Sequence, residues 1–215
     1  MMKTVLAYGD SNTWGAATVA RPDDRYAYEE RWPGVMAATL GGGWRVIEEG
    51  LPGRTTVHDD PVEGAYMDGK TYLMPCLRSH RPLDVVAIML GSNDLKARFA
   101  VPASDIAAGA GELVRVVKQA EAGRDGGVPK ILLIAPAPML NHTGERPDIG
   151  RMFVGGYEKS LELAPLYRAV AEAHGVAFLD AGTVMRSSAY DGLHLDPDAH
   201  QALGKAVAAA VAGLA

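Results

Sequence analysis

The feature that most constrains this chain is the regular alternation of short apolar segments with longer amphipathic ones. The clearest short segment is 83–90, LDVVAIML, which is apolar nearly throughout, as expected of a strand that is covered on both faces. Segments that alternate in this way form βαβ units, and right-handed crossovers arrange them into a parallel sheet with helices on both faces. We therefore predict an α/β fold, a three-layer αβα sandwich around a five-stranded parallel sheet.

The predicted elements follow one another without a linker, an internal repeat or a low-complexity segment. Strands are expected at 5–8, 44–48, 83–90, 130–135 and 176–179, and helices at 31–40, 70–80, 102–121, 156–174 and 197–214. Pro165 should kink the helix that contains it. Two long connections, 49–66 and 136–150, interrupt the alternation, and loops of this length in a compact domain usually serve function. The 215 residues fit one domain that spans residues 1–215.

Composition excludes several classes of partner. The formal net charge is −5 and no run of Lys or Arg stands out, which argues against nucleic acid or an anionic membrane surface. No apolar stretch approaches the roughly 20 residues that span a bilayer, and the first residues lack the long apolar core of a signal peptide. The lone cysteine, Cys76, provides no disulfide framework. We expect a cytoplasmic protein without a nucleic-acid or membrane partner.

Glycine-containing turns follow the first three predicted strands: Gly-Asp-Ser-Asn at 9–12, Gly-Leu-Pro-Gly at 50–53 and Gly-Ser-Asn-Asp at 91–94. The carboxyl ends of neighbouring parallel strands meet along one edge of the sheet, where open α/β sheets bind their ligands. A fourth segment, Asp-Gly-Leu-His at 191–194, follows the last strand and should reach the same edge. We therefore expect a serine hydroxyl, a glycine N–H, an asparagine amide and a histidine to share one crevice.

These side chains suit acyl transfer. A serine hydroxyl such as that of Ser11 becomes a good nucleophile when a base takes its proton, and histidine, here His194, titrates close enough to neutral pH to serve as that base. Asp191, three residues earlier, can accept a hydrogen bond from the other ring nitrogen and stabilise the imidazolium. The N–H groups of Ser11 and Gly53 and the amide of Asn93 can bind a developing oxyanion.

Each of these residues also has an ordinary structural role. Asp10 or Ser11 can cap the following helix, Asn93 and Asp191 can form turns, Gly53 can complete a turn after Pro52, and a histidine can simply lie half-buried at the surface. Any one of these interpretations outweighs a catalytic role for that residue alone. The ordered combination of Ser, Gly, Asn and Asp-x-x-His is much less expected by chance.

The four segments resemble the four sequence blocks of the SGNH, or GDSL-type, hydrolase superfamily, and the resemblance extends over essentially the whole chain. It implies a flavodoxin-like sheet with Ser11 as nucleophile, His194 as base and Asp191 as its partner. It also implies that Ser11, Gly53 and Asn93 form the oxyanion hole, without a metal or a cofactor. Pro52 before Gly53 departs from the consensus of the superfamily and makes the direction of the Gly53 N–H less certain.

Three longer stretches resemble the arylesterase and acyltransferase branch known from mycobacteria and their relatives; they lie at 46–56, 72–77 and 82–94. This resemblance implies hydrolysis of short-chain aryl or alkyl esters, acyl transfer to alcohols or peroxide, and assembly into a homo-oligomer. It also places Trp14, Lys96 and Leu193 near the small-molecule ester substrate. Trp14 and Leu193 could equally be core residues, and Lys96 could equally be a solvated surface lysine.

Other functions remain open at this point. A carbohydrate acetylesterase, a lysophospholipase or a thioesterase could use the same fold. A metal-dependent phosphoesterase would need clustered His and carboxylate ligands, and the only tight cluster of that kind, His58-Asp59-Asp60, fits a polar loop better. A non-catalytic binding domain is the third possibility, since fold alone does not fix function, but both Asp191 and His194 are retained.

Overall fold

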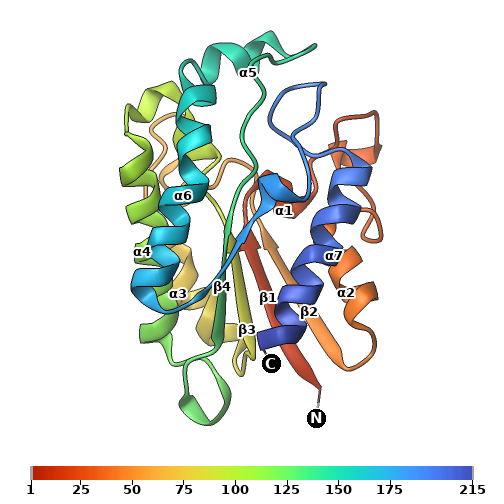
Figure 1. Ribbon diagram of the computed structural model, residues 1–215, viewed down its shortest axis with the longest axis vertical. Coiled ribbons are helices and arrows are strands. Elements are labelled where there is room, and N and C mark those ends of the chain that lie inside the picture. Colours follow the sequence, from red (N-terminus) through yellow and green to blue (C-terminus); the bar gives the residue numbers. More distant parts are fainter. Residues whose placement is uncertain (1, 215) are drawn as a thin grey trace.

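A five-stranded parallel sheet forms the centre of the computed structural model, which describes residues 2–214 (Figure 1). The strands are β1 (Lys3–Gly9), β2 (Trp44–Gly50), β3 (Val85–Met89), β4 (Lys130–Ala135) and β5 (Ala177–Asp180). Their order is β2-β1-β3-β4-β5, and all four neighbouring pairs are parallel. Chain direction in the sheet therefore brings the segments after β1, β2 and β3 to one edge.

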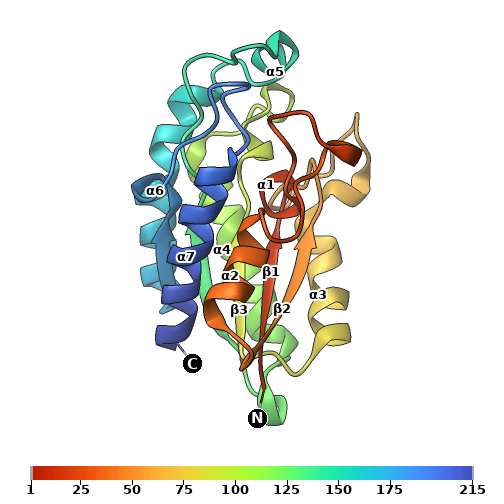
Figure 2. The ribbon, with the colours of Figure 1, turned by 90° about the vertical axis from the view of Figure 1, so that its right-hand side faces the viewer.

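Helices cover both faces of this sheet, as Figures 1 and 2 show. The α-helices are α1 (Ser11–Trp14), α2 (Trp32–Leu40), α3 (Gly69–His80), α4 (Ala103–Ala120), α5 (Pro147–Met152), α6 (Gly156–His174) and α7 (Pro197–Leu214). One hydrophobic core joins α3, α4 and α6 to the sheet, and a second joins α2 and α7 to the opposite face. The predicted α/β sandwich is confirmed.

The structure differs from the sequence prediction mainly in the connections. A one-turn helix, α1, begins just after the first strand, and a second short helix, α5, begins in the long 136–150 connection and ends at Met152. Short 3-10 turns also occur, among them η3 (Asn93–Leu95), which follows β3. The segment 156–174 forms one helix that contains Pro165. Short polar helices such as α5 carry too few residues for a periodic apolar pattern to be recognised.

Two glycines let α1 sit directly on the ends of the strands. A Cβ at Gly50 would lie 2.2 Å from the backbone nitrogen of Trp14, and one at Gly9 would lie 2.8 Å from Cβ of Thr13, which is also in α1. Both distances are far below van der Waals contact, so only glycine allows this approach. The first helical turn is thereby held at the edge where the strands end.

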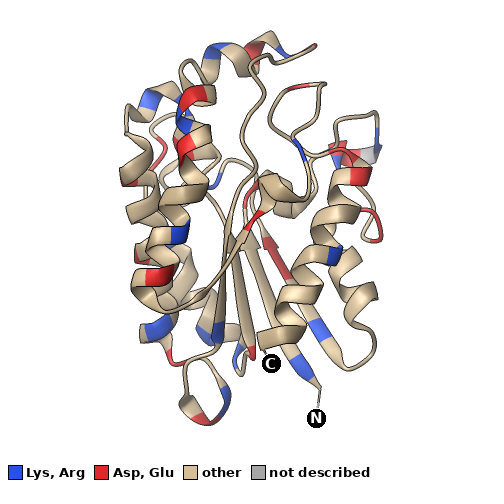
Figure 3. Cartoon of the chain, viewed as in Figure 1, with Lys and Arg blue, Asp and Glu red and all other residues tan. Residues whose placement is uncertain are grey.

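Figure 3 shows Lys and Arg interspersed with Asp and Glu over the helices and loops in view. Within residues 2–214, no helix combines the length and the apolar character that crossing a bilayer requires.

Candidate active site

Ser11 is the first residue of α1, and its hydroxyl is available because its neighbour caps the helix. Asp10 precedes the helix, and its Oδ1 accepts the backbone N–H of Asn12 at 2.9 Å. Burial raises the pKa of this Asp10 carboxyl to about 6. Ser11 Oγ lies 3.0 Å from Nε2 of His194, so the hydroxyl is within hydrogen-bond reach of the ring.

The other side of the His194 ring faces Asp191. Nδ1 of His194 lies 2.6 Å from Asp191 Oδ2, while Oδ1 of Asp191 accepts the backbone N–H groups of Leu193 and His194 at 2.9 and 2.8 Å. Burial alone would raise the pKa of Asp191, but its hydrogen bond to His194, the charge of that ring and the two N–H donors hold it below the usual value. The carboxylate thus both shapes its own loop and fixes the ring orientation.

The potential oxyanion donors are two backbone N–H groups and one side-chain amide. Within residues 2–214, the backbone N–H groups of Ser11 and Gly53 have no protein acceptor. The side-chain amide of Asn93 donates one hydrogen bond to the carbonyl oxygen of Arg54 at 3.1 Å, and an amide nitrogen carries a second hydrogen. Three donors of this kind can stabilise negative charge on a substrate oxygen.

Pro52 turns out to belong to the turn that presents Gly53. The N–H of Arg54 donates to the carbonyl of Leu51 at 3.1 Å, and Gly53 has a φ of +88°. A proline followed by a glycine at positive φ is the sequence preferred for a type II turn. The residue that departs from the superfamily consensus therefore favours the turn instead of disturbing it.

Comparison with known protein families gives a match. The sequence model of the GDSL-like lipase/acylhydrolase family matches residues 7–202. The chain belongs to this family. No curated protein matches it.

Solved structures of similar proteins agree with this membership. A carbohydrate acetylesterase from Sinorhizobium meliloti is 44% identical with a TM-score of 0.92, and the match covers 99% of this chain and 100% of that one. The native aryl esterase of M. smegmatis is 41% identical with a TM-score of 0.91, and the match covers 99% and 100% of the two chains. The sequence resemblance to an SGNH/GDSL-type hydrolase of the arylesterase branch is thereby confirmed.

Buried polar groups tie the strand ends of this GDSL-family protein together. The fully buried Asp94 accepts the backbone N–H of Thr56 at 3.0 Å and also its hydroxyl, and this burial raises the pKa of Asp94. Nη1 of Arg54 donates to the carbonyl of Gly9 at 2.9 Å, and its guanidinium lies 4.2 Å from the centre of the Tyr8 ring. Asp94 is the last residue of the 91–94 motif, and Arg54 and Thr56 follow the 50–53 turn, but no role in the site was predicted for any of the three.

The loop that carries Asp191 and His194 is held mainly by backbone hydrogen bonds. The N–H groups of Leu140 and Glu145 donate to the carbonyls of Gly192 and Tyr190 at 2.9 and 2.8 Å. These contacts come from the long 136–150 connection, which therefore packs against the histidine loop. A functional use of this connection was predicted from its length, but these contacts were not.

A cavity of about 700 Å³ opens above Ser11 and His194. Trp14 lines it, where the family resemblance places that residue, together with Pro52. The GDSL motifs do not include two further lining residues, Arg146 and Tyr190. Arg146 comes from the 136–150 connection, and a bidentate pair with Asp148, with contacts of 3.0 and 2.8 Å, holds its guanidinium.

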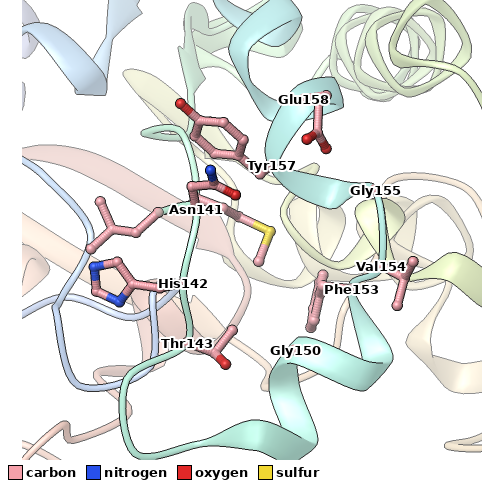
Figure 4. A pocket seen from close by; sticks show the side chains of 11 residues that line it. Asn141, His142, Thr143, Gly150, Phe153, Val154, Gly155, Tyr157 and Glu158 are labelled. Atoms are coloured by element: carbon pink, nitrogen blue, oxygen red, sulfur yellow. The ribbon is translucent and has the colours of Figure 1, made fainter.

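A second cavity, of about 240 Å³, lies beside α5 and the start of α6 (Figure 4). His142, Tyr157 and Glu158 are among its lining residues, and Ser11 and His194 are not. The 136–150 connection thus borders two separate hollows.

Lys96 and Leu193 do not line the cavity above Ser11. Leu193 is 8% exposed and packs in the core, while its carbonyl accepts the amide of Asn12 at 3.4 Å. Lys96 is 2% exposed, and its Nζ lies 2.7 Å from Oε1 of Glu63. Lys96 is therefore not a solvated surface lysine, and its position needs another explanation.

The His58-Asp59-Asp60 cluster does not form a metal-binding arrangement in the part of the chain that the structure describes. Asp60 instead pairs with Arg98 at 2.9 Å. The one mixed group with ligand spacing among residues 2–214 consists of Glu49, Cys76 and His80. Its atoms are already partnered, since Glu49 Oε1 lies 2.8 Å from His80 Nε2, and burial, together with the charge of Glu49, raises the pKa of the Cys76 thiol to about 12.

Proposed function

We propose that this GDSL-family protein is a serine esterase that hydrolyses short-chain acyl esters through an acyl-enzyme on Ser11. The observation that carries the proposal is the chain of contacts from Ser11 Oγ to His194 Nε2 at 3.0 Å and from His194 Nδ1 to Asp191 Oδ2 at 2.6 Å. This geometry is the one that serine hydrolases on unrelated folds use to activate a hydroxyl.

In the first half of the reaction, Oγ of Ser11 attacks the carbonyl carbon of the ester while its proton passes to Nε2 of His194. The carbonyl electron pair moves onto oxygen, and the resulting oxyanion accepts hydrogen bonds from the N–H groups of Ser11 and Gly53 and from the amide of Asn93. Asp191 stabilises the imidazolium. When the tetrahedral intermediate collapses, the leaving alcohol takes the proton from His194.

In the second half, water enters and His194 removes its proton. The hydroxide adds to the acyl carbon, a second oxyanion forms at the same donors, and collapse releases the carboxylic acid and returns the proton to Ser11. Another alcohol or a peroxide in place of water would give acyl transfer, which we propose as a competing outcome of the same intermediate. Whichever nucleophile reaches the acyl-enzyme faster determines the product.

Trapping the covalent intermediate tests the proposal. The protein is mixed with p-nitrophenyl acetate and quenched in acid, and its peptides are then analysed by mass spectrometry. One acetyl group on the peptide that contains Ser11 is the expected result. Turnover without acetylation of Ser11, or acetylation only elsewhere, would remove Ser11 from the mechanism.

Acetylated sugars are a second candidate substrate class. They are favoured by the polar lining of the cavity, which includes Asp23, Asp24, Arg146 and Tyr190, and by the similarity to the carbohydrate acetylesterase of S. meliloti. A panel of p-nitrophenyl esters of increasing acyl length and acetylated monosaccharides, assayed with and without added alcohol, separates these classes. A higher kcat/KM for the sugars than for p-nitrophenyl acetate would favour a carbohydrate acetylesterase.

Assembly and location are further parts of the proposal. A homo-oligomer is supported by apolar side chains exposed near the two cavities, Val19 and Val154, and sedimentation that gives only a monomer at micromolar concentration would contradict it. A cytoplasmic location rests on the lone buried cysteine, Cys76, and cell fractionation tests it.

A further inference from the structure

The carboxylate of Glu63 lies against the turn that presents Gly53. A Cβ placed on Gly53 would be 2.5 Å from Oε2 of Glu63 and 3.0 Å from Sδ of Met67. The positive φ of Gly53 favours glycine at this position, and the Glu63 carboxylate lies close against it. A negatively charged group consequently sits beside a proposed oxyanion donor, where it would oppose the charge that develops in the reaction.

Lys96 forms an ion pair with this carboxylate and neutralises its charge. Its Nζ lies 2.7 Å from Oε1 of Glu63 and 3.6 Å from Oδ2 of Asp60, and the lysine side chain is only 3% exposed. Arg98 completes the group through contacts of 2.9 Å with Asp60 and 3.4 Å with Glu63. Two cations thus balance two anions, and removal of either cation leaves an excess negative charge next to Gly53.

Lys96 also belongs to the turn that presents Asn93. Its backbone N–H donates to the carbonyl of Asn93 at 3.2 Å, at the end of η3. Asp60 shapes the partner segment, because its Oδ1 accepts the N–H groups of Val62 and Glu63 at 2.8 and 3.0 Å. One side chain therefore connects the turn of Asn93 with the segment that packs against Gly53.

We propose that Lys96 is a positioning residue for the oxyanion hole. It compensates the charge of Glu63 and holds the Gly53 and Asn93 donors at the relative positions that oxyanion binding requires. This proposal rests on the proposed function, in which those donors bind the oxyanion. Lys96 touches neither the substrate nor the reacting atoms. It acts on the electrostatic potential and the geometry at the point where negative charge appears.

The expected kinetic signature follows from when that charge appears. The ground-state ester is neutral at its carbonyl oxygen, and the full charge develops only in the tetrahedral transition state. A defect in charge compensation should therefore lower kcat and leave KM nearly unchanged. A loss of general stability would instead reduce the fraction of folded protein without changing the rate per folded molecule.

The experiment compares Lys96→Met, Glu63→Gln and the double variant, with rates normalised to folded protein. In Lys96→Met, kcat for p-nitrophenyl acetate should fall roughly 10- to 100-fold because Glu63 is left uncompensated. Glu63→Gln alone should cause little loss, since Lys96 keeps Asp60 as a partner. The double variant should recover most of the lost rate because it removes the excess negative charge.

Arg124→Met serves as the matched control. Arg124 pairs with Asp84 at 2.6 Å directly before β3, at the end of the sheet opposite to Asn93, so kcat should not change. An unchanged kcat in Lys96→Met, or a double variant as slow as the single one, would overturn the proposal. If Lys96→Met fails to fold, a large loss of kcat in Glu63→Gln alone would equally overturn it.

Trapping separates this proposal from the proposed function. If Lys96 acts as proposed, Lys96→Met still accumulates acetyl on Ser11, only more slowly. Absence of Ser11 acetylation in the unmodified protein would contradict the esterase mechanism itself. A normal Ser11 acetylation rate in Lys96→Met would contradict only the role of Lys96.

Discussion

The two sets of residues proposed to act with Ser11 are held in place in different ways. Gly53 and Asn93 make up the donor side, and Asp191 and His194 make up the histidine side. On the side of Gly53 and Asn93, charged and polar side chains connect the ends of three strands, as the contacts of Arg54 with Gly9, of Asp94 with Thr56 and of Lys96 with Glu63 show. On the side of His194, the loop that carries Asp191 and His194 is joined by backbone hydrogen bonds to the 136–150 connection. The donor side is thus tied to the sheet, and the histidine side is tied to another loop.

This difference matches what each side has to do in the proposed reaction. Donors for an oxyanion work best when they are fixed before the charge develops. An imidazole that exchanges protons first with Ser11 and then with water or alcohol has to serve several partners in turn. Changes on the donor side should therefore lower kcat more than changes to the contacts that hold the histidine loop.

Removal of the atom that both sides share should have the largest effect. Ser11→Ala deletes the proposed nucleophile, and hydrolysis of p-nitrophenyl acetate should fall roughly 10⁴- to 10⁶-fold. Thermal unfolding and circular dichroism should stay close to those of the unmodified protein, because Asp10 and not Ser11 caps α1. Undiminished turnover in a folded variant would show that Ser11 is not the nucleophile.

A change on the donor side should have the next largest effect. Asn93→Ala removes the only side-chain donor among the three, and kcat should fall about 100- to 1000-fold with little change in KM. The unfolding free energy should also decrease by about 1 kcal/mol, since the hydrogen bond to Arg54 is lost. A rise in KM at constant kcat would instead assign Asn93 to ground-state binding.

Acid should weaken the helix that follows the histidine loop. His200 on α7 is fully buried, Nδ1 accepts the backbone N–H of Trp32 on α2 at 3.2 Å, and burial lowers the pKa of His200 to about 4. Because the folded pKa lies below the unfolded value of about 6.5, this stabilisation is complete above pH 6.5 and is lost as the pH falls towards 4.

The destabilisation by acid through His200 is the third largest effect that we expect. Between pH 7 and 4.5, the unfolding free energy of the unmodified protein should decrease by about 2 kcal/mol more than that of His200→Asn. Chemical denaturation at both pH values measures the difference. Identical pH dependence in the two proteins would mean that the pKa of His200 is the same in the folded and in the unfolded state.

The smallest expected effect tests the contact between the two loops. Gly192 has a φ of +75°, and a Cβ there would lie 2.2 Å from the carbonyl oxygen of His142. Gly192→Ala should displace the 136–150 connection, lower kcat roughly 10-fold and cost about 1 kcal/mol of stability. Gly126→Ala is the control, because Gly126 has a φ of +74° with no atom within 4 Å of the added Cβ.

Loss of activity in both glycine variants, or in neither, would contradict the idea that the histidine side depends on its contact with the 136–150 connection. Loss in Gly192→Ala alone would show that contact between loops, and not positive φ as such, is what the histidine side requires.

The sheet and the donor side follow closely from local sequence. The segment 83–90 is apolar nearly throughout, and the structure places β3 (Val85–Met89) within it. Gly-Ser-Asn-Asp at 91–94 ends that strand at the edge where Ser11 lies. In both cases, strand direction and glycine-containing turns alone determine which residues come together.

The histidine side and the role of Lys96 could not be predicted in the same way. Backbone hydrogen bonds from Leu140 and Glu145 leave no side-chain pattern in the sequence, so the position of Arg146 and Tyr190 over the cavity was not foreseen. Lys96 pairs with a glutamate 33 positions earlier, and a lysine in a polar segment is indistinguishable from a solvated one until the fold brings such partners together.

Ser11 and His194 are 183 positions apart along the chain. During synthesis, the serine leaves the ribosome long before His194 is made, so in the proposed mechanism a nascent chain has no base to activate Ser11. Turnover therefore reports that both termini have reached their native positions. Recovery of esterase activity after dilution from denaturant should measure completion of the whole fold more directly than any spectroscopic signal from a single helix.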